Sequence, residues 1–140
     1  MRILIAEDDY VSRKFMLKFL SRFGDCDVTV DGMEAIEAFL MALDENRRYE
    51  LVCLDIMMPQ LDGIQALKTI RKLELERGIP EEQRAKIIMT TALNATDEVF
   101  DSFESGSEAY SVKPIDTEKF VEVLMKLGLL TEAATEVMAE

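Results

Sequence analysis

The sequence predicts an α/β protein in which a five-stranded parallel sheet carries helices on both faces. Short apolar segments alternate with longer segments of helical periodicity five times along the chain. This alternation is typical of a parallel sheet, because a helix returns each strand to the same direction. The segments Arg2–Ala6, Leu51–Leu54 and Lys86–Thr91 are almost continuously apolar, as strands buried on both faces are.

The other two strands are expected at Cys26–Val30 and Ala109–Val112. After the first strand, an apolar residue recurs at every fourth position, which predicts an amphipathic helix over Val11–Phe23. This predicted stripe consists of Val11, Phe15, Phe19 and Phe23. The expected strand order is 2-1-3-4-5, the flavodoxin-like arrangement of a doubly wound sheet.

Four further helices are indicated by apolar residues at helical spacing and by capping residues. The second is marked by Ala35, Ile36, Phe39, Leu40 and Leu43 after Gly32, and the third by Ile64, Leu67 and Ile70. The fourth is marked by Val99, Phe100 and Phe103 after Thr96, and the fifth by Phe120, Val123, Leu124 and Leu127 between Asp116 or Thr117 and Gly128. The charged stretch Glu76–Ala85 is expected to be a loop.

The length and amino-acid composition restrict the functions that this protein can have. The 140 residues fit one domain, and 49% hydrophobic with 31% charged residues is normal for a packed core. With 28 acidic and 16 basic residues the net charge is −12, which disfavours direct nucleic-acid binding and favours protein partners. The absence of histidine excludes histidine-based catalysis and histidine metal ligands.

The chain is expected to be cytoplasmic and not inserted in a membrane, since it has no signal peptide and no apolar run of membrane-spanning length. Cys26 and Cys53 lie in apolar segments and are expected to be reduced. In the predicted order their strands flank the first strand, about 9–10 Å apart. A disulfide requires Cα atoms within about 7 Å, so both should be free thiols.

Polar side chains end four of the predicted strands. Glu7-Asp8-Asp9 follows the first, Asp55 the third, Thr90-Thr91 the fourth and Lys113-Pro114 the fifth. The carboxyl ends of parallel strands lie at one edge of the sheet, where α/β proteins bind ligands. The sequence therefore predicts carboxylates, a hydroxyl and an ammonium group gathered at this edge.

The carboxylates of Glu7, Asp8 and Asp55 would repel one another unless a cation lay between them. Mg²⁺ is the natural choice, because it prefers oxygen ligands and is bound by one or two carboxylates with water and phosphate. The alternative is that Glu7-Asp8-Asp9 only caps the following helix, which accounts for Asp9 but not for the other two.

Asp55 is either a turn residue or a nucleophile. A carboxylate can form an acyl phosphate when cations neutralise the incoming phosphoryl group. Thr91 and Lys113 taken singly are unremarkable in strands. Together they supply a hydroxyl donor and a point cation for phosphoryl oxygens.

With these residues in view, the sequence closely resembles the response-regulator receiver domain of two-component signalling, in particular stand-alone chemotaxis regulators. The resemblance runs from Met1 to about Leu127. The segments that carry it are Ile3–Asp9, Leu54–Gly63, Met89–Ala92 and Val112–Pro114.

The resemblance implies a role for each matching residue. Asp55 would be the phosphoacceptor, with Thr91 as the hydroxyl and Lys113 as the lysine of the site. Glu7, Asp8, Asp55 and the backbone carbonyl of Met57 would hold Mg²⁺. Tyr110 would be the aromatic switch residue. It also implies a cis Lys113–Pro114 bond, and it departs from the family at Ile115, where an aromatic residue is common.

The implied function is that of a single-domain response regulator. It would accept a phosphoryl group from a histidine kinase or histidine phosphotransfer protein, catalyse only its own phosphorylation and dephosphorylation, and signal through phosphorylation-dependent contact with a protein target. Residues 1–128 would form the receiver domain. Residues 129–140 would be a C-terminal extension, either a short sixth helix or a frayed end.

Three alternatives belong to other classes. A phosphatase of the haloacid dehalogenase type would need a second acid where Met57 stands. A flavin carrier would need a phosphate-binding loop where Glu7-Asp8-Asp9 stands. A scaffold that keeps the fold without phosphorylation would not need every site residue.

Overall fold

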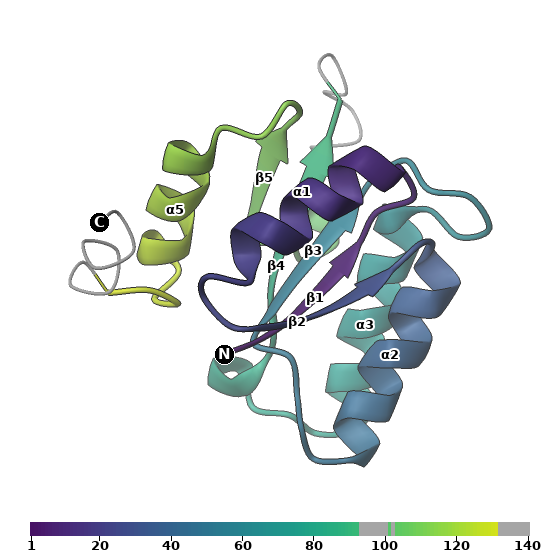
Figure 1. Ribbon diagram of the computed structural model, residues 1–140. Coiled ribbons are helices and arrows are strands. Elements are labelled where there is room, and N and C mark those ends of the chain that lie inside the picture. Colours follow the sequence, from purple (N-terminus) through teal and green to yellow (C-terminus); the bar gives the residue numbers. More distant parts are fainter. Residues whose placement is uncertain (93–100, 102, 132–140) are drawn as a thin grey trace.

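The computed structural model describes residues 1–92, 101 and 103–131. Its centre is an all-parallel sheet in the order β2-β1-β3-β4-β5, which confirms the predicted class and strand order (Figure 1). The strands are β1 (Arg2–Ala6), β2 (Asp25–Thr29), β3 (Leu51–Asp55), β4 (Lys86–Thr91) and β5 (Ala109–Val112). β2 begins one residue earlier than predicted, because Asp25 pairs with Arg2 at the start of β1.

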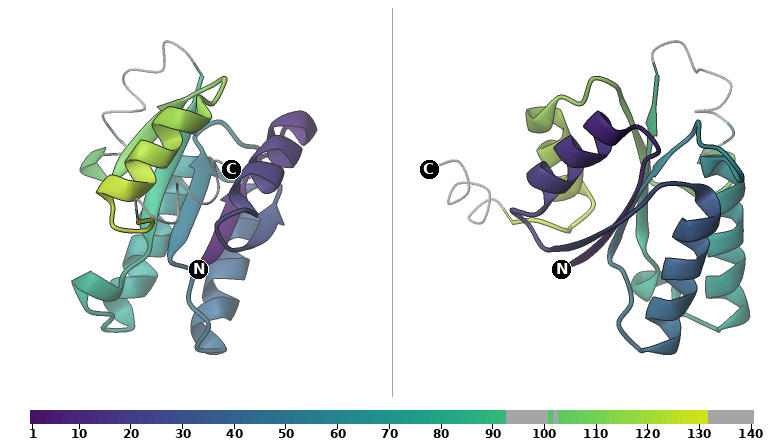
Figure 2. Two further views of the ribbon diagram at one scale, coloured as in Figure 1. Left: turned by 60° about the vertical axis from the view of Figure 1, so that its left-hand side comes forward. Right: turned by 45° about the vertical axis from the view of Figure 1, so that its right-hand side comes forward.

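Helices cover both faces of the sheet. Figure 2 shows α1 and α5 on one face and α2 and α3 on the other. Their bounds are α1 (Tyr10–Leu20), α2 (Gly32–Asp44), α3 (Gly63–Glu76) and α5 (Thr117–Lys126). The predicted loop contains the 3-10 turn η1 (Glu81–Gln83). Of the fourth predicted helix, Thr96, Val99 and Phe100 lie outside the described residues, and Phe103 is helical.

Each face of the sheet has its own apolar core, because side chains alternate along a strand. On the α2–α3 side Leu4 and Val52 are fully buried among Phe39, Leu67 and Ile70. On the α1–α5 side the buried residues are Ile3, Ile5, Met16, Phe19, Leu20, Leu51, Cys53, Ile88, Phe120 and Leu124. Glu7 and Asp55 continue the alternation of β1 and β3 toward this second side.

The buried face of α1 differs from the predicted stripe. Val11 is 73% exposed and Phe15 43% exposed, whereas Met16, Phe19 and Leu20 are buried. A strict spacing of four residues drifts around a helix that has 3.6 residues per turn. The stripe therefore leaves the core at its N-terminal end, where Val11 and Phe15 remain at the surface.

Aspartates cap the four described α-helices. Asp9 accepts a hydrogen bond from the Ser12 amide at 2.9 Å, and Asp31 accepts one from the Glu34 amide at 2.9 Å. Asp62 and Asp116 cap α3 and α5 in the same way. Acidic N-caps bind unpaired amides and complement the positive end of the helix dipole. Asp9 and Asp31 also fix the backbone shortly after β1 and β2.

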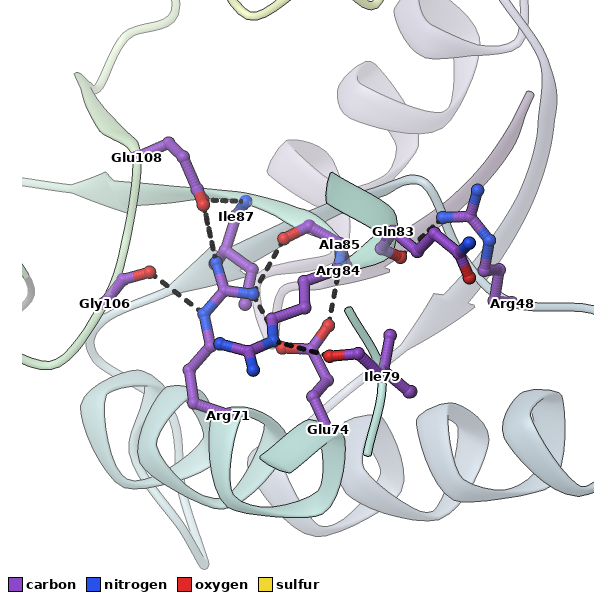
Figure 3. A network of polar contacts seen from close by, with 10 residues as sticks. All are labelled: Arg48, Arg71, Glu74, Ile79, Gln83, Arg84, Ala85, Ile87, Gly106 and Glu108. Atoms are coloured by element: carbon purple, nitrogen blue, oxygen red, sulfur yellow. Dashed lines mark hydrogen bonds and ion pairs between the residues drawn. The ribbon is translucent and has the colours of Figure 1, made fainter. Parts of the chain in front are cut away.

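At the opposite edge of the sheet, Arg71 on α3 joins three segments (Figure 3). Its guanidinium pairs with the buried Glu74 at 2.7 Å and with Glu108 at 2.8 Å, and it donates to the Ala85 and Gly106 carbonyls. Glu108, just before β5, also accepts a 2.6 Å hydrogen bond from the amide of Ile87 on β4. Arg71 thus fastens the amino ends of β4 and β5 to α3.

The end of the described chain lies against the α1–α5 core. Gly128 follows α5 with a φ of 78°, as the predicted helix end requires, and Leu129 and Leu130 pack on this core. The remainder of the proposed extension, residues 132–140, lies outside the described residues. None of the helices in the described part of the chain has the length and apolarity of a bilayer span.

Candidate functional site

Three carboxylates meet at the carboxyl edge of the sheet. Glu7 follows β1, Asp55 ends β3, and Asp8 lies beside them with its side chain toward solvent. One oxygen from each lies within 4.8 Å of the others. Glu7 is 2% exposed and Asp55 is 4% exposed, so two negative groups are held close together with little water between them.

Lys113 brings a positive charge to the buried carboxylates. Its Nζ lies 2.7 Å from Glu7 Oε2 and 3.0 Å from Asp55 Oδ2. The chain reaches this position from β5, where the Lys113 amide donates to the Thr91 carbonyl at 2.8 Å. The Lys113–Pro114 bond is cis, as predicted. One ammonium group therefore bridges the ends of two strands.

The electrostatics of the site follow from burial and from this bridge. Burial raises the pKa of Glu7 to about 7, although the hydrogen bond from Lys113 acts in the opposite direction. Burial alone would lower the pKa of Lys113, but its hydrogen bonds to Glu7 and Asp55 raise it above the usual value. The site thus keeps a charged lysine and a carboxyl group that is poised to take up a proton near neutral pH.

Backbone contacts orient the carboxylates. The Asp9 amide donates to Glu7 Oε1 at 3.1 Å, and the Met57 amide donates to Asp55 Oδ1 at 3.2 Å. Arg13, on the first turns of α1, donates to the carbonyls of Glu7 at 3.0 Å and Asp8 at 3.2 Å. Sequence reasoning missed Arg13, because a basic residue near a helix start looks like any solvated side chain.

This donor set fits a divalent cation of the magnesium type. Carboxylate oxygens are hard ligands, and three of them surround one point within reach of a single ion. The predicted fourth ligand, the Met57 carbonyl, belongs to the loop that follows Asp55 directly. Every ligand is an oxygen, with no thiol or imidazole to select a softer metal.

Thr91 and Tyr110 belong to β4 and β5, whereas the acidic group is at the ends of β1 and β3. Thr91 is buried at the end of β4, and its hydroxyl donates to the Ala92 carbonyl at 3.3 Å. The Tyr110 ring is 44% exposed and packs edge-on against Phe103, with centroids 5.6 Å apart. Tyr110 lies within β5 and Lys113 follows its last residue, a spacing of three for which strand alternation predicts opposite faces.

A cleft of about 230 Å³ opens beside the acidic group. Glu7, Thr90 and Lys113 form its polar end, and the exposed Val11 and Phe15 of α1 form part of its apolar wall together with Ile115. Ile115 is the position where the sequence departs from the resemblance. The N-terminal part of the predicted apolar stripe, Val11 and Phe15, therefore borders the site, whereas Phe19 is in the core.

Comparison with known proteins agrees with this geometry. Residues 3–125 match the response regulator receiver domain family. Chemotaxis protein CheY of Listeria monocytogenes is 29% identical over 123 residues, which cover 88% of this chain and 95% of that protein. Peroxide stress-activated histidine kinase mak1 of Schizosaccharomyces pombe is 33% identical over 114 residues, which cover 81% of this chain and 7% of the kinase.

Solved structures show the same fold. The CheX–CheY–BeF3–Mg complex from Borrelia burgdorferi contains a chain that superposes with a TM-score of 0.75 at 27% identity, covering 91% of this chain and 88% of that one. A Francisella response regulator receiver domain gives 0.69 at 30% identity, covering 90% and 94%. The chain nevertheless spans only 7% of mak1 and 60% of the Bacillus subtilis regulatory protein YhcZ.

Proposed function

Because the chain belongs to the response regulator receiver domain family of two-component signalling, we propose that Asp55 accepts a phosphoryl group from a histidine of a partner protein. The donor is a histidine kinase or a histidine phosphotransfer protein. Similarity to receiver-containing histidine kinases such as mak1 supports this choice. So does the lack of histidine in this chain, which leaves the phosphohistidine to the partner.

The observation that carries the proposal is the position of Lys113 Nζ, 3.0 Å from Asp55 Oδ2, within an acidic group that fits Mg²⁺. An oxygen of Asp55 attacks phosphorus, the phosphorus–nitrogen bond of the donor breaks, and its electron pair returns to the imidazole ring. Lys113 then pairs with phosphoryl oxygens, and Thr91 donates its hydroxyl to one of them.

Mg²⁺ is the proposed cofactor. Glu7, Asp8, Asp55 and the Met57 carbonyl would hold it, and it would neutralise negative charge on the phosphoryl oxygens. The Asp9 amide orients the Glu7 carboxylate, and Arg13 holds the backbone carbonyl of the same residue. The protein's own part is to place Asp55 and Lys113 at the same edge of a rigid sheet.

The output is a protein contact rather than an enzymatic turnover on a separate substrate. Thr91 moves toward the phosphoryl group, and Tyr110 changes its packing against Phe103. A surface that includes β5 and α5 then binds a downstream protein differently. The charge of −12 supports a protein target over nucleic acid, and the free thiols Cys26 and Cys53 fit a reducing cytoplasm.

Acetyl phosphate with Mg²⁺ provides the test. One phosphoryl group should be added, and it should be absent in Asp55→Asn when intact mass is measured. Asp116→Asn is the matched control, because asparagine caps a helix as well as aspartate does and Asp116 is not one of the three carboxylates of the acidic group. Labelling that persists in Asp55→Asn, or that never occurs in the wild type, would contradict the proposal; the second result would favour the scaffold alternative.

A further inference from the structure

The loop between β3 and α3 begins at Ile56, the residue next to the proposed phosphoacceptor Asp55. We call residues 56–62 the phosphoacceptor loop. Its ends are tied by hydrogen bonds from the Ile56 amide to the Thr90 carbonyl and from the Gly63 amide to the Ile56 carbonyl, both 2.9 Å long. Between them Gln60 has a φ of 68°, a left-handed conformation that costs a residue with a side chain some free energy. Within the loop, the Leu61 amide donates to the Pro59 carbonyl at 2.8 Å, and contacts with other elements add to this support.

Gly32, the first residue of α2, touches the loop closely. A Cβ atom built on Gly32 would lie 2.1 Å from the Leu61 carbonyl oxygen and 2.9 Å from Leu61 Cβ. Ordinary contacts between a Cβ and another atom are about 3.4 Å or longer. Only a glycine hydrogen fits between α2 and the Leu61 carbonyl, so the loop rests directly on the helix backbone.

The N-terminus of α2, which forms one side of this contact, is held in place by capping hydrogen bonds and by the core. Asp31 caps the helix through the Glu34 amide, and Glu34 reaches back to the Val30 amide at 3.0 Å. Ala35 and Phe39, one and two turns further on, are buried in the core. An atom added at position 32 would therefore displace the loop and leave the helix in place.

A second glycine, Gly63, packs closely against the other end of the same loop. A Cβ on Gly63 would lie 2.2 Å from the carbonyl oxygen of Asp55 itself. The loop thus packs between the N-termini of two helices: the first residue of α2 contacts Leu61, and the first residue of α3 contacts Asp55. Gly63 is bonded to the loop in sequence, whereas Gly32 is not, so Gly32 supports the Leu61 end of the loop from another element, as the Thr90 carbonyl does at the Ile56 end.

From this geometry we propose that Gly32 is a positioning residue for phosphoryl transfer, which holds the phosphoacceptor loop and so the Met57 carbonyl in register with Asp55. The inference rests on the proposed function of Asp55. It predicts that Gly32→Ala favours the helical conformation at position 32 but slows phosphoryl transfer to Asp55. Alanine favours a helix over glycine, yet its methyl group would push Leu61 by about 1 Å, and a displacement of that size can cost up to roughly 100-fold in rate.

The chain offers a matched control. A Cβ on Gly24 would lie 2.1 Å from the Met1 carbonyl oxygen, the same clash with a backbone oxygen at the amino edge of the sheet. Gly24→Ala and Gly32→Ala should lose similar stability in urea unfolding. In metal-free protein, NMR amide signals of residues 57–63 should shift in Gly32→Ala and stay unchanged in Gly24→Ala.

The functional readouts are Mg²⁺ affinity by calorimetry and the rate of acetyl phosphate labelling, both measured well below the unfolding temperature. Each should fall roughly tenfold or more in Gly32→Ala and remain near wild type in Gly24→Ala. Equal values in the two variants would overturn the positioning role. A wild type that neither binds Mg²⁺ nor becomes labelled would instead overturn the proposed function on which it rests.

A second variant covers the case in which Gly32→Ala does not fold. Leu61→Gly removes the Leu61 Cβ that lies against Gly32 and makes the loop backbone more flexible without adding an atom, while the Leu61 carbonyl remains. We expect weaker Mg²⁺ binding and faster hydrogen exchange of the loop amides. Mg²⁺ binding and exchange equal to those of the wild type would count against the proposal.

Discussion

Lys113 Nζ lies closer to Glu7 Oε2, at 2.7 Å, than to Asp55 Oδ2, at 3.0 Å. Before phosphorylation the lysine is therefore shared between a carboxylate proposed to bind the metal and the proposed phosphoacceptor. This sharing relates the stability of the metal-free protein to the chemistry of the site. The first two predictions follow from it.

Lys113→Gln should destabilise the metal-free protein by about 1–3 kcal/mol, because it leaves the buried Glu7 and Asp55 without their cation. Mg²⁺ should restore part of the loss by neutralising the same carboxylates. Urea unfolding with and without Mg²⁺ measures both effects. Lys72→Gln is the control, since its exposed 3.8 Å pair with Glu76 should contribute less than about 0.5 kcal/mol. Equal losses of stability in the two variants would show that Lys113 stabilises the protein no more than an exposed ion pair does.

The gain in stability from Mg²⁺ should grow as the pH rises toward neutrality. Burial raises the pKa of Glu7 from 4.5 to about 7, so the folded metal-free protein favours the protonated carboxyl group. That contribution is complete below pH 4.5 and is lost as the pH rises through about 7. A metal ion needs the carboxylate, so protons compete with Mg²⁺ below this pH.

Thermal unfolding at pH values on either side of 7 checks this dependence. No histidine complicates the titration in this range. Glu7→Gln should weaken the Mg²⁺ effect and remove its dependence on pH. A gain from Mg²⁺ that is the same at both pH values would contradict the assignment of Glu7 as a ligand.

Both cysteines should behave as free, slowly reacting thiols. Cys26 and Cys53 pair with Ile3 and Ile5 of the intervening β1, as the predicted strand order requires, and neither forms a disulfide. Burial raises the pKa of both thiols, most strongly that of Cys53. In native protein, a thiol reagent should modify Cys26 slowly and Cys53 only after unfolding, as measured by mass spectrometry; Cys26→Ser should abolish the native reaction. Rapid native modification of Cys53 would mean that β3 opens readily.

The environment of Tyr110 should change when Asp55 is phosphorylated. Its ring is half-exposed and touches Phe103, so it has room to move inward if Thr91 leaves its present position. NMR of ring-labelled tyrosine reports this change, with Tyr110→Phe identifying the signal. Thr91→Ala should retain labelling of Asp55 but lose the response of the ring. The buried Tyr49, which donates to Asp27 at 2.6 Å, is an internal reference that should not respond. Identical Tyr110 signals in both states would leave the output to another element.

The strands could be predicted from sequence because local apolar runs determine them, and β1, β4 and β5 have the predicted bounds. The acidic group and Lys113 could be predicted because parallel strands bring their carboxyl ends to one edge. Features that depend on partners distant in sequence could not. Val11 and Phe15 match a helical stripe but face the cleft. Glu74, only 1% exposed, looks like a surface residue until the Ala85 amide, which donates to it at 2.8 Å, is placed beside it.

Arg71 has a mechanical consequence for β5. Through Glu108 it anchors the strand at the end remote from Lys113, and a Cβ at Gly106 would already touch the Arg71 side chain at 3.2 Å. β5 is thus held in place at Glu108, whereas Lys113 at its other end belongs to the acidic group. A displacement of Lys113 would therefore rotate the residues between them, Tyr110 included, about the fixed position of Glu108.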